Sequence, residues 1–97
     1  LAQHYYKNYD VTVDPKSNIL VTSGSKAGIY FSMQAVLNPE DEVLIHEPAW
    51  LSYQEQARIM GVIPKFIPYY AHISEFPTYF TPKTKMIITQ LFLAVFI

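Results

Sequence analysis

The fold is decided by residues 18–37, which read Asn-Ile-Leu-Val-Thr-Ser-Gly-Ser-Lys-Ala-Gly-Ile-Tyr-Phe-Ser-Met-Gln-Ala-Val-Leu. The short β-branched run at residues 19–22 predicts a strand, and the longer apolar segment at residues 25–37 predicts a helix. A small polar turn at residues 23–25 joins them. Because the first N–H groups of a helix lack partners within the helix and carry the positive end of its dipole, phosphate binds readily at such a turn.

The turn between the predicted strand and helix has two interpretations. Gly24 lets the backbone come close to an anion, and the hydroxyls of Ser23 and Ser25 can add hydrogen bonds. Serine and glycine are also ordinary turn and N-cap residues, so the turn alone leaves the phosphate site open. A Walker loop is excluded, because no glycine precedes Gly24 in the chain.

The composition favours one small folded domain. The chain has 97 residues, of which 51% are hydrophobic and 15% aromatic, and this argues against disorder. A formal net charge of -1 gives no electrostatic basis for binding nucleic acid or an anionic membrane. The apolar run at residues 86–97 is shorter than the roughly 20 residues that a membrane span needs. The absence of cysteine favours a reducing compartment, and we expect a cytoplasmic protein.

The rest of the chain continues an alternation of strands and helices. Further strands are predicted at residues 42–46, 62–68 and 85–90, and further helices at residues 1–9 and 50–60. Residues 10–18 are expected to form an extended linker, and residues 69–79 an irregular segment with one helical turn. Pro64 and Pro68 favour an edge position for the strand that contains them. The pattern is typical of a parallel α/β sheet with helices on its faces.

Five segments in this order resemble the class I and II aminotransferases, which are pyridoxal-phosphate enzymes of fold type I. The resemblance extends to Thr89, and the segments are residues 21–27, 37–45, 47–53, 61–62 and 81–85. It implies part of the large, cofactor-binding domain, a three-layer α/β/α structure. It also implies pyridoxal 5'-phosphate as cofactor, an amino acid and a 2-oxo acid as substrates, and a homodimeric parent protein.

The resemblance also assigns a cofactor site. In the family, the turn after the first strand of the large domain cradles the phosphate, which implies this role for Ser23, Gly24, Ser25 and Lys26. The aromatic residue after the Pro turn stacks on the pyridine ring, which implies this role for Trp50, since an indole face suits an electron-poor cationic ring. Without the resemblance, Trp50 would be interpreted as a half-buried core residue. We expect Tyr53 to pack rather than to bind a ligand.

The chain departs from the family in two respects. The family's Schiff-base lysine, its aspartate at the pyridine nitrogen and its substrate-binding arginine belong to later segments, so no catalytic residue is assigned here, and Arg58 is no substitute. The three histidines lack metal-ligand spacing, and no metal site is assigned. Where the family has an Asn-Pro rich segment, residues 91–97 read Leu-Phe-Leu-Ala-Val-Phe-Ile. We therefore expect a partial domain at residues 1–90, and a foreign apolar tail at residues 91–97 of a truncated or frameshifted product.

These departures leave two functions open. The first is a fragment of an aminotransferase that binds the cofactor weakly and does not catalyse turnover alone. The second is a non-catalytic remnant or a weak phosphate-binding α/β module. In either case the strand predicted at residues 19–22 would lose its neighbours, because later segments of the family separate it from the strand at residues 85–90, whereas the other three strands could still pair.

Overall fold

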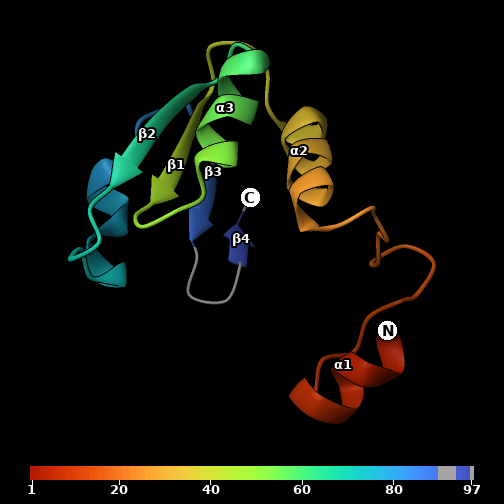
Figure 1. The fold of residues 1–97 in the computed structure, drawn as a ribbon. Coiled ribbons are helices and arrows are strands. Elements are labelled where there is room, and N and C mark those ends of the chain that lie inside the picture. Colours follow the sequence, from red (N-terminus) through yellow and green to blue (C-terminus); the bar gives the residue numbers. More distant parts are fainter. Residues whose placement is uncertain (90–93, 97) are drawn as a thin grey trace.

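The computed structural model of the chain describes residues 1–89 and 94–96 (Figure 1). Its helices are α1 (Ala2–Tyr9), α2 (Ser25–Val36), α3 (Leu51–Ile59) and the 3-10 helix η1 (Ile73–Tyr79). Its strands are β1 (Glu42–His46), β2 (Ile63–Ile67), β3 (Thr84–Thr89) and β4 (Ala94–Phe96). The helices and strands that the sequence predicts between residues 25 and 89 are thus confirmed, with small shifts at their ends.

The sheet is built around β1. The strand order is β2-β1-β3-β4, with β1 parallel to both β2 and β3, while β4 runs antiparallel to β3. The predicted pairing of the three parallel strands is therefore confirmed, and so is the edge position of β2, which carries Pro64. Of the predicted tail, residues 94–96 form β4, whereas residues 91–93 and 97 lie outside the described residues.

Two hydrophobic clusters hold the layers together. On one face of the sheet, α2 and α3 pack against β1 and β3 through buried side chains that include Met33, Ile45, Tyr53, Ala57 and Ile88. On the other face, the segment that contains η1 covers the sheet through Leu44, Ile67, Ala71 and Phe76. The α/β class with covered faces is as predicted, although a 3-10 helix forms the second outer layer in the described residues.

The strand predicted at residues 19–22 is not present. These residues have no strand partner among the described residues, and the side chains of Leu20 and Val21 are 73% and 76% exposed. An extended segment becomes a strand only when a neighbour accepts and donates its ladder hydrogen bonds. Residues 19–22 lack such a neighbour within the described part of the chain, as the family resemblance implied for this segment, and the strand prediction is therefore wrong.

Helix α2 is buried on one face. Ile29 and Met33 are buried, but Phe31 is 49% exposed. The helix packs against α3 and the sheet through its buried residues. Helix α1 buries no side chain at all, and Figure 1 shows it apart from the sheet, at the end of the long connection that leads to α2.

Candidate functional site

Gly24 forms the corner between the connection and helix α2. It is the N-cap residue of α2 and has φ 88° and ψ 164°, a backbone conformation that only glycine adopts without strain. A Cβ atom added at Gly24 would meet nothing within 4 Å, so the space beside it is open. The corner is fixed from the N-terminal side, because the Gly24 amide donates to the Thr22 carbonyl at 2.9 Å and the Thr22 hydroxyl donates to the Gly24 carbonyl at 2.7 Å.

The first turn of α2 offers backbone donors. Among the described residues, the amides of Ser25, Lys26 and Ala27 have no hydrogen-bond acceptor, and no side chain caps the helix. The hydroxyls of Ser23 and Ser25 likewise make no hydrogen bond within the described part of the chain, and both residues are exposed. This set of donors at the positive end of the helix dipole is suited to an anion with several oxygen atoms.

Trp50 lies beside this turn. The Lys26 ammonium nitrogen is 5.4 Å from the centroid of the Trp50 ring. The Trp50 side chain is 46% exposed, so part of the indole is accessible to a ligand. Trp50 is the N-cap residue of α3, and α3 is tied to the turn by a hydrogen bond of 3.1 Å from Gln56 Nε2 to the Lys26 carbonyl. The two parts of the predicted site, which are far apart in sequence, are therefore adjacent in space.

Tyr53 supports Trp50 from within the core. The two rings have centroids 6.2 Å apart at an interplanar angle of 27°, and Tyr53 is fully buried. Burial raises the pKa of the Tyr53 hydroxyl, so the ring stays neutral beside Trp50 at physiological pH. The prediction that Tyr53 is a packing residue is confirmed.

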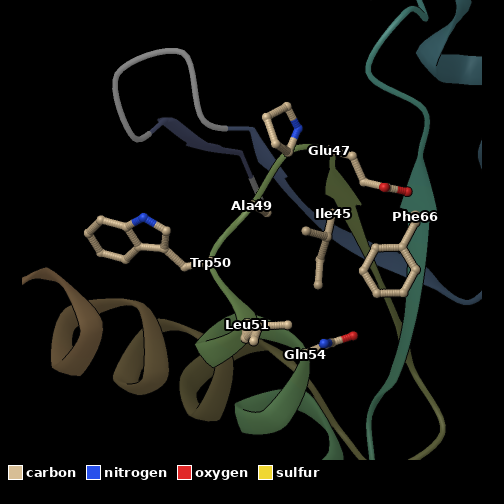
Figure 2. Close-up of a pocket in the computed structure, with 8 residues that line it drawn as sticks. Ile45, Glu47, Ala49, Trp50, Leu51, Gln54 and Phe66 are labelled. Atoms are coloured by element: carbon tan, nitrogen blue, oxygen red, sulfur yellow. The ribbon is translucent and has the colours of Figure 1, made fainter.

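A cavity of about 390 Å³ is lined largely by the segment that joins β1 to α3, Trp50 included. Figure 2 shows the Trp50 ring pointing away from Ile45 and Phe66, which form the apolar wall of this cavity. Its polar groups are the carboxylate of Glu47 and the amide of Gln54, and none of its lining residues is cationic. A cavity with a carboxylate and no cation does not suit a phosphate, so the α2 turn is the better candidate for an anion.

Comparison with known proteins decides the family. The model of the family described as aminotransferase class I and II matches residues 1–89. The chain belongs to the class I and II aminotransferases. The resemblance seen in the sequence is confirmed, and the family consists of pyridoxal-phosphate-dependent enzymes.

Relatives place this aminotransferase chain within a longer protein. It is 35% identical over 94 residues to an asparagine–oxo-acid transaminase of Streptococcus mutans, a match that covers 91% of this chain and 24% of the relative. It is 29% identical over 96 residues to an aspartate aminotransferase of Sulfurisphaera tokodaii, again covering 91% of this chain and 24% of the relative. The chain thus spans about a quarter of the length of the curated relatives that it matches.

Solved structures agree on the fold. An Escherichia coli protein whose reported structure and reactivity identify a methionine aminotransferase function superposes with a TM-score of 0.81 at 26% identity, over 90% of this chain and 24% of that one. A Methanococcus jannaschii protein reported as similar in its active site to kynurenine aminotransferases superposes with a TM-score of 0.79 at 30% identity, over 90% and 23% of the two chains. The described fold is therefore that of part of an aminotransferase large domain of fold type I.

The sequence analysis missed one contact of the candidate site. Gln56 joins α3 to the first turn of α2, and nothing in the sequence distinguishes it from an exposed helix residue except its place beside Ala57, which is buried. Other polar groups lie elsewhere: Arg58 pairs with Glu55 at 2.8 Å on the surface of α3, and His46 Nδ1 is 3.0 Å from the Thr89 hydroxyl. The described residues contain no group of three potential metal ligands and no helix long and apolar enough to cross a bilayer.

Proposed function

We propose that residues 23–26 and Trp50 hold pyridoxal 5'-phosphate, with the phosphate against the first turn of α2 and the pyridine ring on the indole. One observation carries the proposal: the Lys26 ammonium lies 5.4 Å from the Trp50 ring, which brings the anion-binding turn and the stacking surface together. The family match supports the identity of the ligand, and the position of Trp50 beside the turn supports two points of attachment.

The residues present fit this cofactor. The open space beside Gly24 leaves room for a phosphate, and the amides of Ser25, Lys26 and Ala27 are donors without acceptors among the described residues. The exposed indole of Trp50 offers an apolar face for the ring. When bound, this cofactor supplies an electron sink for reactions at the α carbon of an amino acid. The role of this part of the chain is to bind the cofactor and to orient it.

The expected affinity of the chain alone is low. Charge-assisted hydrogen bonds contribute roughly 1.5–3 kcal/mol each, so three at the phosphate give about 5–9 kcal/mol. Aromatic stacking adds about 1 kcal/mol. Association costs an estimated ~4–15 kcal/mol. These terms nearly cancel, so we expect weak, non-covalent binding and no transaminase turnover by the 97-residue chain.

For the whole protein we propose transfer of an amino group between an amino acid and a 2-oxo acid. The relatives carry names that state different amino acids, including asparagine and aspartate, so the proposal extends to the reaction class and not to one substrate. We further propose a homodimer in the cytoplasm. Within the chain, we propose that residues 1–90 form part of the large domain and that residues 91–97 depart from it, and the family match that ends at Thr89 supports this division.

Titration with pyridoxal 5'-phosphate tests the proposal. Calorimetry on the purified chain is expected to show weak saturable binding, and Trp50→Leu is expected to reduce the affinity about tenfold at most, the magnitude of a lost aromatic contact. Tyr69→Leu is the matched control, because Tyr69 is 73% exposed and lies outside the site. Its affinity is expected to equal that of the wild type.

Other outcomes of the titration would contradict the proposal in different ways. Equal affinity of the wild type and Trp50→Leu would show that the indole does not hold the ring. Binding of inorganic phosphate as tight as that of pyridoxal 5'-phosphate would favour the phosphate-binding module. Binding of neither ligand would favour the non-catalytic remnant.

A further inference from the structure

The contact between Lys26 and Trp50 raises a question about the ligand-free site. The Lys26 ammonium occupies a position over the same indole that the proposed function assigns to the pyridine ring. Both ion pairs of the described residues lie elsewhere, between Arg58 and Glu55 and between Lys65 and Glu42. The contact with Trp50 is thus the resting position of a cation that has no carboxylate partner in the described part of the chain.

We propose that Lys26 is a latch on Trp50, which a phosphate group releases. In the ligand-free chain the ammonium rests on the indole; when a phosphate enters the turn, the ammonium moves to it and uncovers the ring. This inference rests on the proposed function, because it assumes that the turn accepts a phosphate. It goes beyond that function by assigning Lys26 two alternative positions and an order to binding, with phosphate first and ring second.

The chain geometry allows both positions. Lys26 is the second residue of α2 and directly follows Ser25, whose amide is one of the donors without an acceptor among the described residues. Its backbone is held by the hydrogen bond from Gln56 to the Lys26 carbonyl, so only the flexible four-carbon side chain has to move. An ammonium that reaches an indole 5.4 Å away can also turn back to an anion at its own helix terminus.

Electrostatics sets the direction of the exchange. A cation over an exposed aromatic ring is attracted only to the ring quadrupole, whereas a phosphate offers a full opposite charge and hydrogen-bond acceptors. The helix N-terminus holds the same phosphate, so the ammonium and the backbone donors act together on one anion. The phosphate therefore displaces the indole as the partner of Lys26.

Fluorescence provides a direct readout, because Trp50 is the only tryptophan among the 97 residues. Inorganic phosphate does not stack on indole, so any change in Trp50 emission on adding it to the wild-type chain reports the departure of the ammonium. We expect a saturable change in the wild type. Without ligand, Lys26→Met is expected to show the Trp50 emission that the wild type shows when saturated with phosphate, and adding phosphate is expected to leave this emission unchanged. Calorimetry is expected to show that the variant binds phosphate about tenfold more weakly than the wild type.

Two further variants separate the latch from a general effect of charge. Lys26→Arg retains a cation that can lie on an indole and bind phosphate, so it is expected to restore the phosphate-dependent change in emission. Lys16→Met removes one positive charge from the exposed connection before α2 and is expected to behave as the wild type. Circular dichroism confirms that each variant is folded before its titration.

The possible results separate the latch from the proposed function. If calorimetry shows phosphate binding but the wild-type emission does not change, or if Lys26→Met responds as the wild type does, the latch is wrong and the cofactor site stands. If the wild-type chain binds neither inorganic phosphate nor pyridoxal 5'-phosphate, the cofactor site is wrong and the latch with it.

Discussion

Glu42, the first residue of β1, is a buried carboxylate held by two partners. The Thr81 hydroxyl donates to one of its oxygens, and the Lys65 ammonium lies 2.9 Å from the other. The hydrogen bond from Thr81 and then that from Lys65 lower the pKa of Glu42 below its ordinary value of 4.5. The charged carboxylate therefore connects the start of β1 to β2 and to the residues that precede β3.

The lowered pKa of Glu42 predicts acid sensitivity. Its contribution to folding stability is complete above its unfolded-state pKa and is lost as the pH falls through the lower folded-state pKa. Urea unfolding between neutral pH and about pH 3 is expected to show this acid loss in the wild type, and a smaller loss in Glu42→Gln. Glu55→Gln, at an exposed ion pair, is the control and should retain the wild-type dependence. An unchanged acid dependence in Glu42→Gln would contradict this role.

Tyr53 gives a second prediction for a single side chain. Its ring is fully buried, and its hydroxyl has no hydrogen-bond partner among the described residues. Tyr53→Phe retains the ring and removes the unpaired polar group, so the free energy of unfolding is expected to rise by about 1 kcal/mol. Urea denaturation measures the change, with Tyr69→Phe as an exposed control. A clear loss of stability would mean that the hydroxyl is hydrogen-bonded.

Single residues also show what the sequence could and could not predict about the site. Gly24 and Trp50 follow recognisable neighbours, a strand-like run and a Pro turn, but it was the resemblance to the family that singled them out, because the local pattern left the turn open and favoured a core role for Trp50. The hydrogen bond from Gln56 to Lys26 joins residues 30 positions apart, and no local pattern indicates it. This hydrogen bond depends on how α3 packs against α2, and the packing of two helices cannot be predicted from the local sequence of either one.

Among the elements, α1 is the least integrated. It has 8 residues and buries none of them. A helix this short has little intrinsic stability in water, and without packing it adds little to the fold. The stability of the chain should therefore reside in α2, α3 and the sheet.

Removal of residues 1–9 tests this distribution of stability. We expect the free energy of unfolding to change by less than about 0.5 kcal/mol, as for other changes away from the core. Urea denaturation of the shortened chain gives the value, and Ile45→Ala in the central strand is the contrasting variant, expected to lose about 2–5 kcal/mol. A large loss on removing α1 would show that it packs on the rest of the chain in solution.

Two apolar runs of similar appearance explain why the predicted elements did not all form. Residues 42–46 and 19–22 are both short and rich in branched side chains. The first run is β1 and has a partner on each side, whereas the second has none among the described residues and is exposed. Side-chain pattern predicts which segments can be extended, but pairing depends on partners that are remote in sequence.

For the molecule as a whole, the candidate site lies where the topology of a parallel sheet favours it. Ligands of open α/β sheets bind beyond the carboxyl ends of the strands. The segment after β1 leaves this edge and carries Trp50, and the first turn of α2 meets it there. The chain spans 24% of its relatives, and at this edge we propose only the two cofactor contacts described above.

The proline in β2 has a consequence for how chains meet one another. Pro64 pairs with Val43 on the inner side, and proline has no amide hydrogen to offer on the outer side of an edge strand. A strand from a second chain laid along β2 would find one hydrogen bond of the ladder missing, with the charged Lys65 next to the gap. This edge of the sheet is therefore a poor template for edge-to-edge pairing with a second chain, the step by which sheets extend into fibrils.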